Sequence, residues 1–107
     1  MDITATPNGD RIVLDGDDMT AEAEIPLESQ CPFTGTGVLQ WVGVAGGRIF
    51  AGYAYREGSD LAYLDDGPDY EGFIDEYSTY GERVDAGDVS MDVHQRRGTC
   101  DAILWSA

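Results

Sequence analysis

The clearest hydrophobic pattern in the chain lies in residues 38–55. Two β-prone runs, 38–45 and 48–55, flank Gly46-Gly47, a pair that suits the two-residue turn of a β-hairpin because glycine tolerates a positive φ. A turn at these glycines predicts a register in which the pairs are Val44 with Ile49, Gly43 with Phe50, Val42 with Ala51, Trp41 with Gly52, and Gln40 with Tyr53. Both faces of this hairpin are apolar, so we expect it at the centre of a sheet, with an element packed on each side or with one face reserved for a partner.

The first quarter of the chain predicts short strands separated by tight turns. Its β-prone runs cover residues 3–6, 11–15 and 19–25, and its turn-forming residues cover 7–10 and 16–18. Alternation of small apolar with acidic residues from Thr20 onward predicts a strand with one face toward water. Residues 26–37, which contain two prolines and two glycines, are expected to form a connecting loop.

A second pattern predicts one amphipathic helix over about residues 68–80. Apolar side chains recur there at helical spacing and form one stripe, which consists of Tyr70, Phe73, Ile74, Tyr77 and Tyr80. The residues Asp66-Gly67-Pro68 supply a cap and a proline for the first turn, and Gly81 suits the position after the last turn. We expect this helix to pack its stripe on a face of the sheet.

Alternation returns in residues 88–94, which predicts a further strand, and residues 99–105 predict a last one. The order of elements indicates an α+β fold, with a mainly antiparallel sheet of about five or six strands, the 38–55 hairpin at its centre and the 68–80 helix on one face. A length of 107 residues and a hydrophobic fraction of 42% suit a single folded domain over 1–107.

Charge changes the picture from fold to function. The chain has 21 Asp and Glu residues against 6 Arg and no Lys, which gives a formal net charge of −15. A protein of this charge lacks the basic surface that direct binding to nucleic acid or to an anionic membrane requires. The N-terminus has no basic segment, and the longest apolar run, 42–45, is too short to cross a membrane. We therefore expect a cytoplasmic protein that makes no contact with membranes.

Residues that commonly carry catalysis are scarce. His94 is the one histidine, which excludes paired-histidine metal motifs, and its neighbours Asp92 and Arg96 favour an exposed or ion-paired side chain over a general base. Cys31 and Cys100 fit no zinc spacing, and the sequence leaves open whether they are two buried thiols or a disulfide. We therefore predict that the protein is not an enzyme, with no catalytic residue and no cofactor.

The acidic clusters do not predict a specific metal site either. An EF-hand loop beginning at Asp65 would place Asp69, Glu71 and Glu76 at ligand positions, but Gly67 and Tyr70 occupy its third and sixth positions. The third position requires an oxygen ligand and the sixth a glycine. No metal ligand is therefore assigned.

The placement of the acids carries the functional hypothesis. Residues 57–92 hold 12 acidic residues and one Arg, so they contribute −11 of the −15. On the predicted helix the apolar stripe faces inward and the acids face outward without basic partners. We predict that these outward carboxylates and those just before the helix bind a partner, the set being Asp65, Asp66, Asp69, Glu71, Asp75 and Glu76.

Fixed carboxylates at such density resemble the phosphates of a nucleic acid. In small size, acidity and lack of catalytic motifs, the chain is similar to phage-encoded inhibitors such as anti-CRISPR and anti-restriction proteins, and to immunity proteins that block toxic nucleases. This similarity implies a basic nucleic-acid-binding protein or effector complex as the partner.

Two other hypotheses remain open. The excess of Asp over Glu and the absence of Lys are also expected of a halophile-adapted or GC-biased domain with another function. Alternatively, Trp41, Phe50 and Tyr53 form an apolar surface for a partner-binding subunit, a chaperone or a homodimer.

Overall fold

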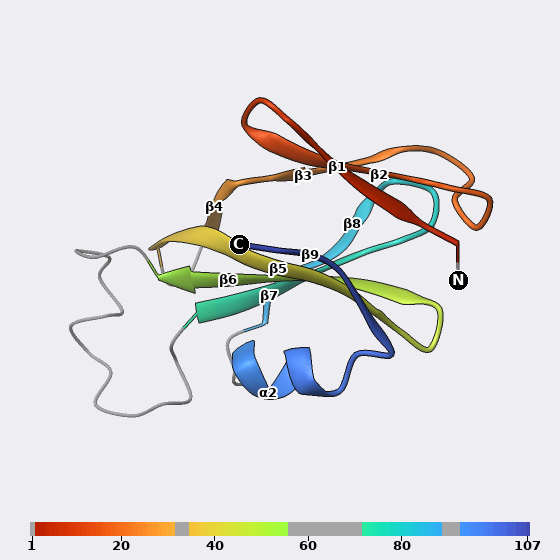
Figure 1. Cartoon of the computed structure of the whole chain (residues 1–107). Helices are drawn as coiled ribbons and strands as arrows, with labels where there is room; N and C mark the ends of the chain where they lie inside the picture. The colour runs from red at the N-terminus through yellow and green to blue at the C-terminus, as the bar shows by residue number, and fades with distance from the viewer. Residues whose placement is uncertain (1, 32–34, 56–71, 89–92) are drawn as a thin grey trace.

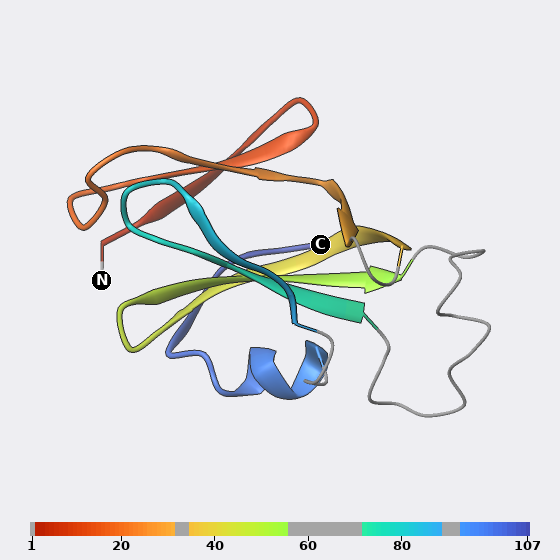
Figure 2. The ribbon, with the colours of Figure 1, turned by 180° about the vertical axis from the view of Figure 1, so that it is seen from behind.

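The computed structural model describes residues 2–31, 35–55, 72–88 and 93–107, and its fold is mostly β (Figure 1). Two antiparallel sheets lie one above the other, and a short helix lies on the far side of the larger sheet (Figures 1 and 2). The small sheet contains β1 (Thr4–Asn8), β2 (Arg11–Asp15) and β3 (Ala23–Pro26). The large sheet contains β4 (Glu28–Cys31), β5 (Gly35–Ala45), β6 (Arg48–Tyr55), β7 (Gly72–Tyr77), β8 (Arg83–Asp88) and β9 (Ala102–Ser106). The helix is α2 (Val93–Gly98).

The small sheet is a simple meander in the order β1-β2-β3. Gly9 adopts a φ of 64° in the turn between β1 and β2, which lies within the turn predicted for residues 7–10. Alternate side chains of β2 and β3 are fully buried toward the large sheet, and these are Ile12, Leu14, Ala23 and Ile25. The intervening side chains form an outer face that points away from the large sheet.

The predicted 38–55 hairpin is present as β5 and β6. Gly46 and Gly47 form its turn with φ values of 57° and 76°. Four of the five predicted pairs are found, but a bulge at Gln40 moves the last one, so Tyr53 pairs with Leu39. The other edge of β5 pairs first with β4 and then with β9. Residues 26–37, predicted as a loop, therefore include β4 and the start of β5.

The predicted helix over 68–80 is wrong, and with it the α+β fold class. Residues 72–77 form strand β7, which pairs with β6 on one side and β8 on the other. Phe73 and Tyr77 face the small sheet, while Ile74 faces α2. Because β7 is covered on both faces, apolar side chains are needed on both, and their spacing in the sequence therefore also fits a helix. Residues 68–71 of the predicted helix lie outside the described part of the chain.

The C-terminal segment also differs from prediction. Val93 and His94, placed in a strand over 88–94, are the first residues of α2, and residues 89–92 lie outside the described ranges. The predicted last strand is present as β9 with its start shifted to Ala102. Thr99 instead bonds back to the helix, its backbone N–H donating to the carbonyl of Arg96 at 3.0 Å.

The apolar core has two parts, one on each side of the large sheet. The larger part lies between the sheets and includes Leu14, Ile25 and Tyr53. The smaller part lies between the large sheet and α2 and consists of Trp41, Phe50, Ile74 and Val93. Both faces of the central hairpin are therefore buried within the chain. Among the described residues, no helix is long and apolar enough to cross a membrane.

Candidate functional site

The predicted contact set is divided by the structure. Asp65, Asp66, Asp69 and Glu71 lie outside the described residues. Asp75 and Glu76 lie next to one another on β7, where the strand directs them to opposite faces of the large sheet. The predicted helix placed both carboxylates outward and without basic partners. Neither carboxylate has that position in the structure.

Asp75 is a buried carboxylate that faces the small sheet. It is 1% exposed, and one of its oxygens lies 3.7 Å from the guanidinium of Arg83 on β8. Burial, followed by the nearby charge of Asp75, raises the pKa of Tyr77 to about 12. The phenol of Tyr53 donates a hydrogen bond of 2.7 Å to the carbonyl of Pro26, and burial raises its pKa strongly. Asp75 thus belongs to a structural polar group in the core.

Glu76 lies on the other face of β7, where it forms an ion pair with Arg48 of β6. Arg48 also stands over the ring of Phe50, 5.1 Å from its centroid. The bond to Glu76 raises the pKa of Arg48, so this guanidinium is charged at every physiological pH. Glu76 is thereby neutralised by a residue of the same chain.

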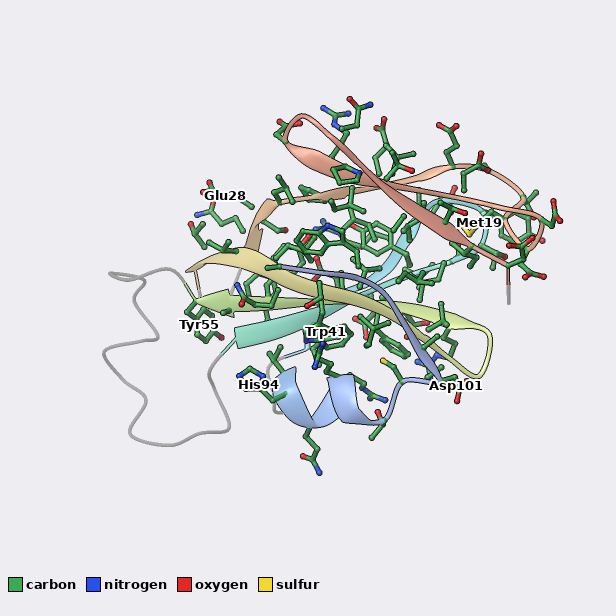
Figure 3. The ribbon with its side chains drawn as sticks, viewed as in Figure 1. Met19, Glu28, Trp41, Tyr55, His94 and Asp101 are labelled. Atoms are coloured by element: carbon green, nitrogen blue, oxygen red, sulfur yellow. The ribbon has the colours of Figure 1, made fainter. Side chains whose placement is uncertain are left out.

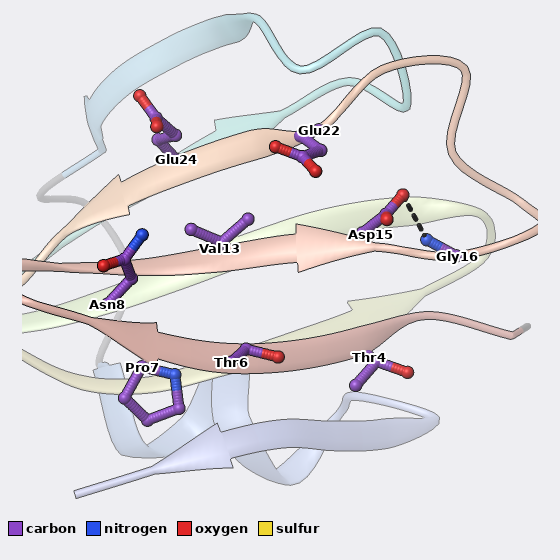
Figure 4. A pocket seen from close by; sticks show the side chains of 9 residues that line it. All are labelled: Thr4, Thr6, Pro7, Asn8, Val13, Asp15, Gly16, Glu22 and Glu24. Carbon is purple, nitrogen blue, oxygen red and sulfur yellow. Dashed lines mark hydrogen bonds between the residues drawn. The ribbon is translucent and has the colours of Figure 1, made fainter.

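An acidic face is instead formed by the outer side of the small sheet (Figure 4). Strand alternation brings Thr4 and Thr6 of β1, Val13 and Asp15 of β2, and Glu24 of β3 to the same side, because alternate residues of a strand share a face. We call this surface, together with Glu22, the acidic face. It is hollowed by a depression of about 540 Å³ that is lined by Thr4, Thr6, Pro7, Asn8, Val13, Asp15, Gly16, Glu22 and Glu24.

One arginine offsets this concentration of acids. Residues 2–24 carry seven acids and one arginine, a net charge of −6, and the acids are Asp2, Asp10, Asp15, Asp17, Asp18, Glu22 and Glu24. Arg11 bonds to Asp10 at 3.1 Å and to Glu24 at 3.0 Å, and these bonds, the first above all, raise its pKa. Asp15 and Glu22 form no ion pair within the described residues. Their charge is therefore directed to solvent.

The turn between β7 and β8 packs against the chain segment just before β3. Its Thr79 carbonyl accepts bonds from the backbone N–H groups of Thr20 at 2.8 Å and Ala21 at 3.3 Å. Gly81 has a φ of 84° and packs so closely that an added Cβ would lie 3.1 Å from the carbonyl carbon of Glu22. This packing fixes the turn against the β2–β3 connection, so the exposed Glu82 joins the same end of the molecule.

Basic side chains gather on the opposite side of the molecule. Three of the five arginines in the described ranges, Arg48, Arg96 and Arg97, lie on or beside the face of the large sheet that α2 covers. Arg96 stacks over the Phe50 ring at 4.7 Å from its centroid, on the helix that also carries His94 (Figure 3). The structure therefore separates these three arginines from the acidic face.

Cys100, which follows the end of α2, is a free thiol. Burial raises its pKa despite the nearby Arg96, and its Sγ donates to the Arg96 carbonyl at 3.5 Å. A low-pKa nucleophile is therefore not formed here. In the described part of the chain, no three His, Cys, Asp or Glu side chains are placed to hold a metal ion.

Sequence reasoning did not single out Asp15, Glu22 and Glu24. The sequence signal that could have identified them is the alternation in residues 11–15 and 22–25, which directs these acids away from the core. The prediction relied instead on the higher density of acids in residues 57–92. Comparisons with protein families, with curated proteins and with solved structures found no match.

Proposed function

We propose that this chain is a non-enzymatic inhibitor or interaction protein that occupies the basic groove of a nucleic-acid-binding protein as a nucleic-acid mimic. The observation that carries the proposal is the acidic face, where Asp15, Glu22 and Glu24 surround a hollow and, among the residues that the structure describes, Arg11 alone offsets them. A CRISPR effector, a restriction enzyme or a toxic nuclease presents the complementary groove.

Spacing on a sheet suits this role. Alternate residues of a strand lie roughly 6.6 Å apart and neighbouring strands about 4.8 Å apart. Both spacings are below the Debye length of about 8 Å at physiological ionic strength, so a partner experiences the carboxylates as one continuous field. A duplex presents its phosphates to a basic groove in the same manner.

Rigidity is the second support for mimicry. Asp15 and Glu24 are carried by paired strands whose inner side chains, including Leu14 and Ile25, are fully buried. Preformed charges lose little conformational entropy on binding, which favours affinity and fast association with a basic surface. Asp65, Asp66, Asp69 and Glu71 remain predicted contacts from the sequence, whereas Asp75 and Glu76 do not contribute to this surface.

The proposal is tested by displacement of a fluorescent DNA duplex from purified CRISPR effectors, restriction enzymes and nucleases. Two triple variants with the same charge change are compared, one with Asp15, Glu22 and Glu24 changed to Arg and one with Asp65, Asp66 and Asp69 changed to Arg. We expect the wild-type chain to displace the duplex from a member of this set, less effectively as salt increases.

Reversal on the acidic face is expected to weaken displacement at least tenfold, because it replaces attraction by repulsion at the centre of the contact. Circular dichroism confirms that each variant remains folded. Unchanged displacement by the acidic-face variant would exclude that surface, while loss in the 65–69 variant alone would transfer the contact to that segment. Mimicry would be contradicted if the wild-type chain displaced DNA from none of the proteins tested at low salt.

A further inference from the structure

The turn between β1 and β2 is preceded by Asn8, the only asparagine in the chain, and begins with Gly9. Asn8 pairs with Arg11 at the end of the β1–β2 ladder, so Gly9 and Asp10 are the two central residues of the turn. Gly9 has a φ of 64° and Asp10 has no positive φ, as in a type II′ turn. The hairpin therefore favours a glycine directly after an amide side chain.

The surroundings of this turn are open. Asn8, Gly9 and Asp10 are exposed, and a Cβ added to Gly9 would meet no atom within 4 Å beyond its chain neighbours. The Asn8 side chain lines the hollow of the acidic face (Figure 4) and forms no hydrogen bond with a residue that the structure describes. Tertiary packing therefore shields neither the Asn8 amide nor the backbone nitrogen of Gly9.

We propose that Asn8 is a site of spontaneous deamidation, in which the backbone nitrogen of Gly9 attacks the amide carbon Cγ of Asn8. Hydroxide takes the proton from the Gly9 N–H, and the N–Cγ bond forms. The Cγ–Nδ2 bond then breaks, and ammonia leaves after taking a proton from water. The resulting cyclic imide joins the Gly9 nitrogen to both carbonyl carbons of residue 8.

Water opens this imide at one of its two C–N bonds. Breaking the bond to Cγ leaves the main chain intact and gives an aspartate. Breaking the bond to the main-chain carbonyl carbon gives an isoaspartate, in which the chain runs through Cγ. Either route exchanges the amide of Asn8 for a carboxylate, with water consumed and ammonia released.

Two features of the hairpin favour this attack. Glycine has no Cβ, so the approach to the Gly9 nitrogen is unhindered. The reaction also requires Asn8 to leave its strand conformation, and the place of Asn8 in the ladder makes this a local event. Asn8–Arg11 is the last pair before the turn, so opening that pair frees Asn8 while the rest of β1 stays paired.

Asp15-Gly16 provides an internal contrast. The Gly16 N–H donates a hydrogen bond of 2.8 Å to the Asp15 carboxylate, and a Cβ added to Gly16 would lie 2.9 Å from the carbonyl carbon of Asp2. The nitrogen there is bonded and its residue is closely packed. A carboxylate is also a poorer electrophile than an amide, because its negative charge repels the attacking nitrogen. Asn8 combines an amide with an open glycine.

The modification changes the charge of the acidic face. Strand alternation places Asn8 on the same side as Thr4 and Thr6, and opposite Arg11. A carboxylate at position 8 changes the net charge of residues 2–24 from −6 to −7. The isoaspartate product also lengthens the backbone at the end of β1, which separates the pair with Arg11. The chemistry at Asn8 is independent of the proposed function.

The test is incubation of the folded chain at mildly alkaline pH, with a parallel sample unfolded in guanidinium chloride. Intact-mass spectrometry follows the exchange of an amide for a carboxyl group. Trypsin then cleaves after Arg11 and releases the peptide that contains Asn8, which localises the change. The Asn8→Asp variant supplies the reference peptide that distinguishes aspartate from isoaspartate.

We expect the folded chain to convert Asn8 at a rate within about tenfold of the rate in the unfolded chain, because opening the turn is local. Asn8→Gln retains an amide but closes a larger ring much more slowly, so this variant should gain no mass over the same period. Conversion confined to the unfolded chain would show that the hairpin protects Asn8 and would overturn the proposal. An equal mass gain in Asn8→Gln would overturn it as well.

Discussion

The indole ring of Trp41 lies directly over Gly52, its cross-strand partner in the central hairpin. A Cβ at position 52 would lie within 2.6 Å of the ring atom Cζ2, a distance that normal packing does not allow. The glycine therefore permits the aromatic ring to cover the strand backbone, and this contact joins the hairpin to the core beneath α2.

Gly52→Ala is expected to destabilise the fold by about 1–3 kcal/mol, because the added methyl group overpacks a core with no free space. Chemical denaturation measures the change. Gly98→Ala is the matched control, since nothing lies within 4 Å of an added Cβ there, and its free energy of unfolding should be unchanged or slightly higher. Equal effects of the two substitutions would contradict the packing described.

Gly72→Ala distinguishes the observed strand from the helix that the sequence predicted. Inside an exposed helix, alanine would add about 1 kcal/mol of stability over glycine. In β7 the new Cβ would lie 2.8 Å from the carbonyl carbon of Tyr53 and overlap its oxygen, so we expect clear destabilisation of the β6–β7 pairing. Thermal melting gives the sign, and an increase in melting temperature would favour the helix.

The contrast between the hairpin and β7 shows what local pattern can determine. Gly46-Gly47 between two β-prone runs specifies both the turn and the register, because the interaction is between neighbours in sequence. Residues 72–77 are ambiguous, since Phe73, Ile74 and Tyr77 fit one stripe of a helix and equally fit a strand buried on both faces. Packing against β6, β8 and the small sheet favours the strand over the helix, and no local sequence signal identifies these packing partners.

The same limit applies to the candidate site. The net charge of −15 predicted an acidic surface, but not which carboxylates compose it. Asp75 is buried in the core, and Glu76 forms an ion pair with Arg48. Both positions result from the pairing of strands that are distant in the sequence. Asp15 and Glu22 are displayed together because β2 and β3 are adjacent in the small sheet, a relationship that alternation alone does not reveal.

Salt dependence of stability separates mimicry from salt adaptation. On the mimic proposal, the acids repel one another but the core between the sheets holds the fold, so the chain should be folded in dilute buffer and gain a modest increase in melting temperature with added KCl. Calorimetry at low and multimolar KCl measures this. A chain that folds only in multimolar KCl would support salt adaptation as the origin of the charge.

The Asp75–Arg83 pair predicts an asymmetric response to mutation. Arg83→Gln leaves the 1%-exposed Asp75 without the guanidinium, so we expect a loss of about 1–3 kcal/mol. Asp75→Asn removes the buried charge and leaves a half-exposed arginine to water, which should cost less. Denaturation of both single variants and the double variant measures the coupling, and exactly additive losses would show that the two side chains do not interact.

Tyr77 predicts a loss of stability at alkaline pH. Its pKa is raised to about 12 in the folded chain, by burial first and by Asp75 second, whereas the unfolded value is about 10. Because the folded state holds the proton more tightly, the contribution is complete below pH 10 and falls as pH rises from about 10 to about 12, by on the order of 2 kcal/mol. Denaturant melts across this range measure the slope. Tyr77→Phe should reduce it, while Tyr80→Phe, at a side chain 66% exposed, should leave it unchanged. An identical slope in all three proteins would show that Tyr77 is not the group responsible.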